Sequence, residues 1–214
     1  MSEKVPIARS PITPPEPITM SDGWEISARR SSAVLTLTDC TPLAKFQVRA
    51  PAPGRAATML GIPFGRAAKG ADGVLVVGSG PGEWLLIGPP DHGKAIAARL
   101  EELVARVADE LVTFADLTHG RALMRLKGSS GPELLAKICG ADFSDDMVPD
   151  GAALRSSVAA VATDIIRDDR DGVRSYLLHC ERSSGQYLYE ALLDAGTTFD
   201  IEVDGLRNSQ PTTH

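Results

Sequence analysis

The second half of the chain repeats one pattern, in which an alternating apolar run is followed by apolar residues at helical spacing. Residues 121–126 alternate as a strand does, and Ser130 then begins a predicted helix that Gly140 ends. Residues 173–180 alternate in the same way, and residues 183–186 begin a second helix. The pattern therefore predicts two successive strand-helix pairs.

Two more strands complete this half of the chain. Residues 158–166 form an apolar and β-branched run, which a charged turn at residues 167–172 joins to the strand at 173–180. A last short strand is expected at residues 199–203. The resulting order, β-α-β-β-α-β, is that of a ferredoxin-like unit.

The first half of the chain shows the same order of elements. Ile96, Leu100 and Leu103 recur at helical spacing and predict a helix over residues 94–108. The other expected elements are a strand at 43–48, a short helix after Gly54, a hairpin of strands at 74–77 and 84–87, a strand at 112–117 and an added strand at 33–37. We therefore predict an α+β fold with two tandem ferredoxin-like β-α-β-β-α-β modules, at residues 24–117 and 118–205.

The two ends of the chain differ in composition from the part between them. Five of the first 23 residues are prolines, which interrupt regular backbone hydrogen bonding, and few large apolar residues compensate for this. We predict a disordered Pro-rich tail over residues 1–23 and a flexible C-terminus over residues 206–214.

Composition and charge narrow the range of partners. The chain has 43% hydrophobic and 23% charged residues, which is close to ordinary globular usage. Its net charge of −6, with basic residues interleaved among acidic ones, argues against nucleic acid or an anionic membrane as a partner. No stretch approaches the ~20 apolar residues of a membrane span. Cys40, Cys139 and Cys180 lack C-x-x-C spacing, which indicates reduced thiols and a cytoplasmic protein.

A glycine-rich stretch before Trp84 is the first candidate for a binding site. Glycines at positions 78, 80 and 82 would allow backbone N–H groups to approach a phosphate. A dinucleotide fingerprint needs a small residue at position 83 and a helix after it. Glu83 occupies that position, and an apolar strand follows. We interpret the stretch as a tight hairpin loop.

His119 and two arginines are further candidates. Asp116, Thr118 and His119 could supply a general base with its carboxylate, although neighbours in sequence rarely form a triad, so we favour a structural or interface role for His119. Arg155 and Arg182 each precede two serines, a combination that suits an oxyanion. Helix capping explains the stretch after Arg182 more simply, whereas both interpretations stay open for Arg155.

No catalytic constellation is evident elsewhere in the sequence. The four histidines lack ligand spacing and no acidic cluster accompanies them, so no metal site is expected. Cys180 alternates with Leu178 along a predicted strand and is expected to be a small buried apolar residue. Neither a G-x-S-x-G motif nor a P-loop occurs.

Several collinear stretches nevertheless resemble one protein family, the gamma subunits of heterotetrameric sarcosine oxidase. The resemblance spans residues 33–201, nearly the whole predicted folded part. It rests on DCTPLAK at 39–45, GSGPGEW at 78–84, DLTHGR at 116–121, PDGAALRSS at 149–157 and HCERSSGQYL at 179–188. The family is in turn distantly similar to folate-dependent aminomethyltransferases, whose N-terminal arrangement would match the tandem α+β fold.

The resemblance implies a place in a larger enzyme. Such complexes demethylate sarcosine to glycine, offer the one-carbon unit to tetrahydrofolate and form hydrogen peroxide. The alpha, beta and delta subunits would be the partners, with FAD, FMN, NAD and tetrahydrofolate bound there and no cofactor in this chain. No catalytic residue is assigned to this subunit by the family pattern, and none is carried over.

Three hypotheses follow from the residues and the resemblance together. The chain is a non-catalytic subunit of a sarcosine oxidase-type complex, a subunit of another N-methyl amino acid oxidase or dehydrogenase such as one acting on N-methylglutamate, or a free-standing folate-binding protein. The last hypothesis places folate between the modules, where Arg155 and Glu83 would face each other. The candidates for partner contact or folate binding are Glu83, Trp84, His119, Arg155 and Arg182.

Overall fold

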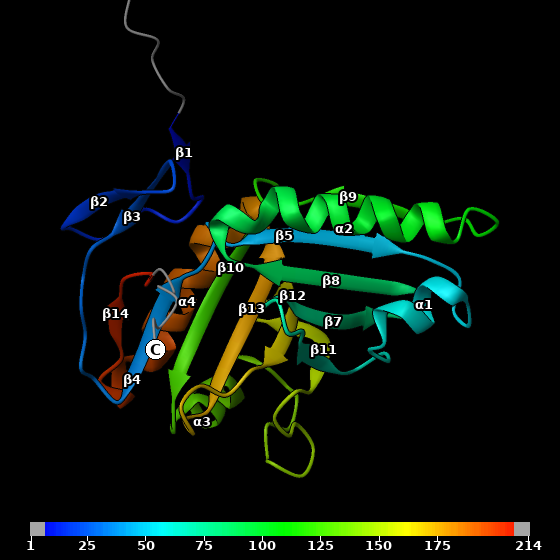
Figure 1. The fold of residues 1–214 in the computed structure, drawn as a ribbon. Helices are drawn as coiled ribbons and strands as arrows, with labels where there is room; N and C mark the ends of the chain where they lie inside the picture. Colours follow the sequence, from blue (N-terminus) through cyan, green and yellow to red (C-terminus); the bar gives the residue numbers. More distant parts are fainter. Residues whose placement is uncertain (1–6, 208–214) are drawn as a thin grey trace, which may run out of the picture.

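The computed structural model describes residues 7–207, which form three β-sheets and four α-helices (Figure 1). Two of the sheets are large and pack face to face. We call them the smaller sheet, which has five strands, and the larger sheet, which has six strands. The third is a short N-terminal sheet.

The smaller sheet has the strand order β6-β7-β8-β5-β9, with neighbouring strands antiparallel. Its outer face is covered by two helices, because Phe46, Trp84 and Leu86 point outward and meet Ile96 and Leu100 of α2. The strands are β5 (Ala44–Arg49), β6 (Ala67–Lys69), β7 (Leu75–Gly80), β8 (Glu83–Gly88) and β9 (Thr113–Asp116), and the helices are α1 (Arg55–Leu60) and α2 (Gly93–Arg106).

The larger sheet has the strand order β11-β12-β13-β10-β4-β14. Met124, Tyr176 and Leu178 point to its outer face and pack against Leu134 of α3 and Leu188 of α4. The strands are β4 (Leu35–Asp39), β10 (Arg121–Gly128), β11 (Ala153–Val158), β12 (Val161–Arg167), β13 (Ser175–Glu181) and β14 (Glu202–Asp204), and the helices are α3 (Gly131–Ile138) and α4 (Gly185–Gly196).

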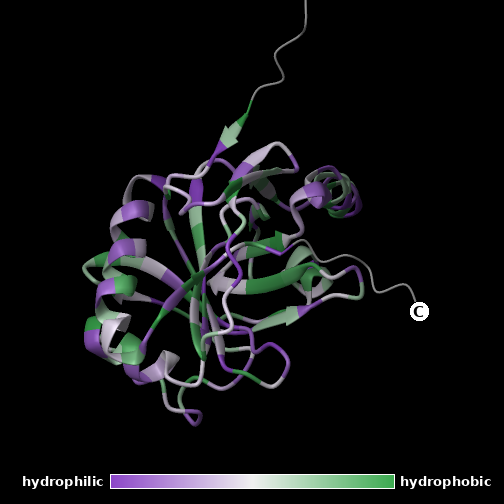
Figure 2. Cartoon of the chain, turned by 90° about the vertical axis from the view of Figure 1, so that its left-hand side faces the viewer, coloured by the Kyte–Doolittle hydropathy of each residue, from purple (hydrophilic) through white to green (hydrophobic). Residues whose placement is uncertain are grey.

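The inner faces of the two main sheets meet in a third apolar core. Leu85 and Ile87 of the smaller sheet pack in one cluster with Leu123, Ile166 and Leu177 of the larger sheet. The molecule therefore has four layers, helix, sheet, sheet and helix. Figure 2 shows hydrophobic colour concentrated on the central strands, while the helices carry both kinds of residue.

The mixed α+β class is confirmed, but the expected pair of separate tandem modules is not found in that form. Strand β4, from the first half of the chain, pairs with β10 and β14 in the larger sheet. Leu35 and Leu37 thereby enter the core beneath α3 and α4. Alternation predicts that a strand has a buried face, but it does not say which sheet supplies the partner strands.

The expectation of a disordered tail up to residue 23 is wrong for residues 7–23, and its first six residues lie outside the described residues. Strands β1 (Ala8–Arg9), β2 (Ile18–Ser21) and β3 (Trp24–Ser27) form the N-terminal sheet. Ile12, between two of them, is 0% exposed and belongs to the core of the larger sheet. Burial of this side chain stabilises the ordered segment and compensates for the regular backbone hydrogen bonds that the prolines interrupt.

Local signals place several elements correctly and a few incorrectly. The glycine-rich stretch is the predicted hairpin between β7 and β8. Strand β11 is missed, since Val158 ends it rather than beginning the next strand. Ser130 and Ser184 stand at the helix N-caps without the predicted side-chain capping hydrogen bonds. Three 3-10 turns complete the described chain, namely Pro90–His92, Arg182–Ser184 and Thr197–Phe199.

Of the predicted flexible C-terminus, only residues 206 and 207 are described, and residues 208–214 lie outside the described residues.

Candidate functional site

A row of charged side chains crosses from the larger sheet to the smaller one. Arg155 donates from Nη2 to Glu83 Oε1 at 2.8 Å and from Nε to Asp164 Oδ1 at 2.6 Å. Asp164 Oδ2 lies 3.0 Å from His179 Nδ1. We call Glu83, Arg155, Asp164 and His179 the inter-sheet network.

Strand register explains why these residues meet. Arg155 on β11 is directly opposite Asp164 on β12, and Asp164 is directly opposite His179 on β13. Residues paired across neighbouring strands point to the same face, which here is the face turned toward the smaller sheet. Glu83 begins β8 in that sheet and closes the row from the other side.

The charges of the network hold both acids in their ionised form. Burial alone would raise the pKa of Glu83, but Arg155 and then Arg49 hold that pKa below its usual value. Burial likewise opposes ionisation of Asp164, and His179 and Arg155 lower its pKa. The two carboxylates in turn raise the pKa of Arg155. Within the network one guanidinium thus offsets two carboxylates, and Arg49 adds a second cation beside Glu83.

His179 is the most deeply buried member, with 4% of its surface exposed. Burial lowers the pKa of its imidazole, and the nearby Asp164 opposes that effect without reversing it. With the proton on Nδ1 facing Asp164, Nε2 is left as a hydrogen-bond acceptor. That atom is buried and has no hydrogen-bond partner among the described residues.

A cavity of about 240 Å³ lies against the network. Glu83, Arg155, Asp164 and His179 all line it, and Arg49 and Arg121 add two further guanidinium groups. Arg49 approaches Glu83 within 3.3 Å, and Arg121 approaches Glu181 within 2.5 Å. The cavity thus offers cations, carboxylates and one free imidazole acceptor to any occupant.

The arrangement is better suited to joining the sheets than to catalysis. Asp164 is shared between Arg155 and His179, and no hydroxyl or thiol of the described residues donates a hydrogen bond to His179. A nucleophile beside a base is therefore lacking. Among the described residues, no group of three or more His, Cys, Asp or Glu side chains is placed to hold a metal ion.

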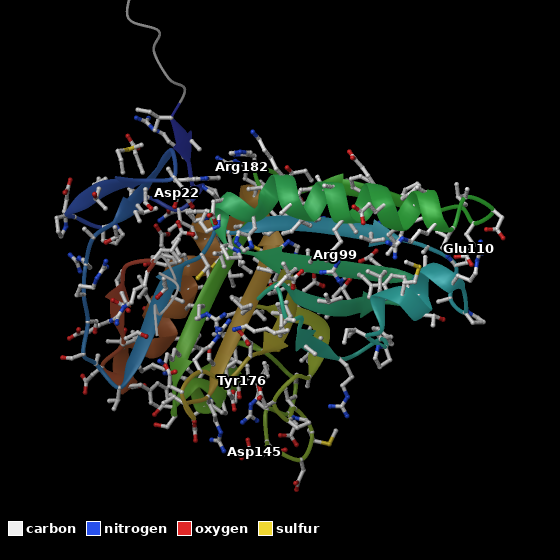
Figure 3. The ribbon with its side chains drawn as sticks, viewed as in Figure 1. Asp22, Arg99, Glu110, Asp145, Tyr176 and Arg182 are labelled. Carbon is white, nitrogen blue, oxygen red and sulfur yellow. The ribbon has the colours of Figure 1, made fainter. Side chains whose placement is uncertain are left out.

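His119 and Arg182 lie in a second cluster, which holds the N-terminal sheet against the body of the molecule. The ring of His119 stacks on Trp24, with centroids 4.8 Å apart and planes 8° apart. Arg182 donates to the carbonyl oxygens of Arg9 at 2.8 Å and His119 at 3.2 Å. Figure 3 shows Arg182 beside the N-terminal strands. The structure thus brings these two candidates together and separates them from Glu83 and Arg155.

Trp84, the remaining candidate, lies in the core beneath α1 and α2. It is 4% exposed, and its indole Nε1 donates to the Ile62 carbonyl oxygen at 2.7 Å. Its ring contributes to packing, and its polar atom already has a partner inside the chain.

Sequence reasoning missed Asp164 and His179. Asp164 and His179 lie in two different predicted apolar runs, 15 residues apart in sequence. Only the register that sets one opposite the other reveals the pair. A polar residue interrupting each apolar run was the available signal, because a charge inside a buried strand needs a partner.

Cys180, by contrast, is confirmed as a buried residue. It is 1% exposed, and burial raises the pKa of its thiol to about 11. Cys40 and Cys139 are buried and free as well. In the described part of the chain, no helix is both long and apolar enough to cross a membrane.

Two comparisons of the sequence with known proteins identify the family. The GCVT N-terminal domain family matches residues 72–211. The gamma subunit of sarcosine oxidase from Arthrobacter sp. is 30% identical over 146 residues, which cover 67% of this chain and 68% of that subunit.

Two solved structures share the fold. A chain of heterotetrameric sarcosine oxidase from Corynebacterium sp. U-96, in complex with pyrrole 2-carboxylate, matches with a TM-score of 0.66 and 23% identity, over 80% of this chain and 89% of that one. The glycine cleavage system aminomethyltransferase T from Bartonella henselae matches with a TM-score of 0.68 and 15% identity. This chain is covered to 88% in that match and spans 55% of the aminomethyltransferase.

Proposed function

Because this chain belongs to the GCVT N-terminal domain family and to the sarcosine oxidase gamma subunits, we propose that it is the non-catalytic subunit of a sarcosine oxidase-type complex. The complex would demethylate sarcosine to glycine, pass the one-carbon unit to tetrahydrofolate and reduce oxygen to hydrogen peroxide. Alpha, beta and delta subunits would be the partners in the cytoplasm, and they would bind FAD, FMN, NAD and tetrahydrofolate.

The observation that carries the non-catalytic role is the state of the inter-sheet network. Arg155 is engaged by Glu83 and Asp164 at once, and Asp164 is engaged by Arg155 and His179. Charges satisfied by one another stabilise a packing arrangement but are poorly placed to transfer protons or attack a substrate. The similarity to a gamma subunit supports the same interpretation, since a complex can place its chemistry in other chains.

Co-expression with the flavin-carrying subunits tests this proposal. Complexes would be purified with and without this chain, and flavin content, subunit composition and turnover on a panel of N-methylated amino acids would be measured. We expect loss of assembly without the chain. Full assembly and full sarcosine turnover without it would refute the proposal, and turnover of N-methylglutamate instead of sarcosine would reassign the complex.

Variants of the candidate residues separate assembly from chemistry. Glu83→Gln, Arg155→Gln and His119→Ala are expected to lower the yield of complex while leaving turnover per assembled complex unchanged. The exposed Arg99→Gln serves as the matched charge control, because Arg99 pairs with Asp72 at the surface. A variant that assembled normally and lost all turnover would contradict a non-catalytic role.

A second candidate function is folate binding by this chain alone, and one feature favours it. The 240 Å³ cavity is lined by Glu83 and Arg155, the two residues expected to face each other there. Isothermal titration calorimetry of the isolated chain with tetrahydrofolate tests this function. Binding that Arg155→Gln weakens and Arg99→Gln does not would support it, and absence of heat would eliminate it.

A further inference from the structure

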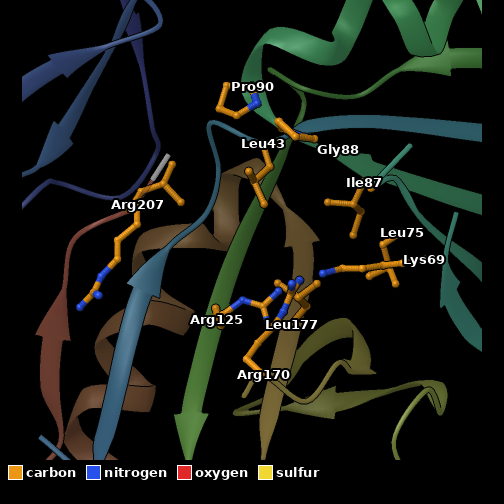
Figure 4. A pocket seen from close by; sticks show the side chains of 13 residues that line it. Leu43, Lys69, Leu75, Ile87, Gly88, Pro90, Arg125, Arg170, Leu177 and Arg207 are labelled. Atoms are coloured by element: carbon orange, nitrogen blue, oxygen red, sulfur yellow. The ribbon is translucent and has the colours of Figure 1, made fainter. Parts of the chain in front are cut away.

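A second cavity lies at the other end of β8, away from the inter-sheet network. Glu83 begins that strand beside the first cavity, and Gly88 ends it beside the second. The second cavity has a volume of about 110 Å³. Both main sheets contribute apolar side chains to its wall, namely Leu43, Leu75, Ile87 and Leu177 (Figure 4).

Three cations converge on this cavity. The side chains of Lys69 on β6, Arg125 on β10 and Arg170 in the turn before β13 point toward one another (Figure 4). Arg125 and Arg170 both donate to the same carboxylate oxygen of Asp168. The neighbouring carboxylates are Asp168 and Asp171, and Asp171 is itself paired with Lys127, which leaves an excess of positive charge at the cavity.

The hydrogen-bonding capacity of the three cations is also incompletely used. Among residues 7–207, Lys69 makes no ion pair and no side-chain hydrogen bond, and Arg170 Nε is buried without a hydrogen-bond partner. Partial burial, followed by the charges of Arg170 and Arg125, lowers the pKa of Lys69. Crowded cations of this kind repel one another unless an anion lies between them.

Arg207 also lines the cavity, but it does not join the three. Its Nη2 lies 3.5 Å from Asp204 Oδ2, and in Figure 4 its guanidinium points away from the other cations.

We propose that this cavity is a binding site for a small organic oxyanion. A carboxylate or phosphate group would lie between Lys69 and Arg170, where charge-assisted hydrogen bonds to the ammonium and to Nε–H satisfy the unused donors. A short apolar group would contact Leu75 and Leu177. The volume restricts the ligand to a small molecule.

Nuclear magnetic resonance of the full-length, ¹⁵N-labelled chain tests the site with three probes, namely acetate, butyrate and inorganic phosphate. Saturable shifts are expected at the backbone amides of Gly73, Leu75 and Gly88, which line the cavity. The apolar wall should make butyrate bind about tenfold more tightly than acetate, because it buries two more CH₂ groups. Tighter binding of phosphate than of either carboxylate would identify the head group as phosphate and equally support the site.

Lys69→Gln is the decisive variant, because Lys69 lies on an edge strand and supports no other side chain. Loss of one charge-assisted hydrogen bond should weaken binding roughly tenfold. Arg106→Gln removes the same charge from the exposed end of α2 and should leave binding unchanged. Equal weakening by both variants, shifts that do not saturate, or shifts confined to other surfaces would each overturn the proposal.

Discussion

Glu83 and Arg155 join the two main sheets directly, with 2.8 Å between Oε1 and Nη2. The pair is asymmetric, because the Glu83 side chain is 15% exposed and that of Arg155 is 52% exposed. Arg155 pairs with two mostly buried carboxylates, Glu83 and Asp164. Its own half-exposed charge is well solvated, so its main contribution is to prevent the cost of leaving those carboxylates buried without this partner.

Replacement of Arg155 by Gln should therefore lower the free energy of unfolding by about 1–2 kcal/mol, after allowance for solvent screening of its exposed side. Urea denaturation measures the change. Arg99→Gln, which removes a surface partner of Asp72, should cost less than about 0.5 kcal/mol. In a double-mutant cycle with Glu83→Gln, we expect a coupling of about 1 kcal/mol. Equal losses for the two arginine variants would argue against a bridging role.

The elements that could be predicted are those whose signal is local. The hairpin was predictable because Gly80, Pro81 and Gly82 form its turn, and glycine and proline dominate such turns. Gly82 adopts a φ of +69°, which favours glycine. Helix α2 was predictable because its apolar stripe depends only on its own sequence.

What could not be predicted depends on partners distant in sequence. Leu35 and Leu37 alternate in the same way whichever sheet accepts β4, so the pattern gave no reason to place that strand beside β10. The site shows the same division. Arg155 attracted attention through its own neighbours, while Asp164 and His179 acquire their roles only from cross-strand register.

The N-terminal segment offers a direct test of its packing through two isoleucines. Ile12 is 0% exposed and Ile7 is 54% exposed. Ile12→Ala should lower the free energy of unfolding by about 2–4 kcal/mol, because it leaves a cavity in the core of the larger sheet. Ile7→Ala should change it by less than about 0.5 kcal/mol. Chemical denaturation of both variants measures the two changes. An Ile12→Ala variant with an unchanged free energy of unfolding would support the disordered tail that the sequence predicts.

Lys45 should make the protein more stable as pH rises from 7 to 9. It is 0% exposed, and burial lowers the pKa of its ammonium to about 7 from the usual 10.5. In this range the unfolded chain binds more protons than the folded one, so the free energy of unfolding increases with pH, by up to about 2 kcal/mol. Above pH 9 the buried thiols of Cys40 and Cys180, whose pKa is raised to about 11, act in the opposite direction.

Lys45→Met should flatten this rise, and the exposed Lys94→Met should preserve it. The Lys45 variant should also be less stable at every pH, because Nζ, as an ammonium or as a neutral amine, donates to the carbonyl oxygens of Thr41 and Leu43. Urea denaturation at pH 7, 8 and 9 gives the three slopes. An unchanged slope in Lys45→Met would assign the pH dependence to other groups.

His179 should govern the loss of stability on mild acidification. Its folded-state pKa is lowered from 6.5, so below that pH the unfolded chain takes up a proton that the folded chain resists, and the free energy of unfolding falls. We expect a decrease of about 1–2 kcal/mol between pH 7 and pH 5. Glu83 and Asp164 have pKa values held below their usual values, and they lose their contributions to stability only at lower pH.

His179→Gln should therefore abolish most of the decrease in the free energy of unfolding, whereas the surface variant His92→Gln should retain it. Thermal or urea unfolding at pH 7, 6 and 5 measures all three proteins, and a His179→Gln slope equal to that of the unsubstituted chain would show that the buried imidazole is not the group responsible.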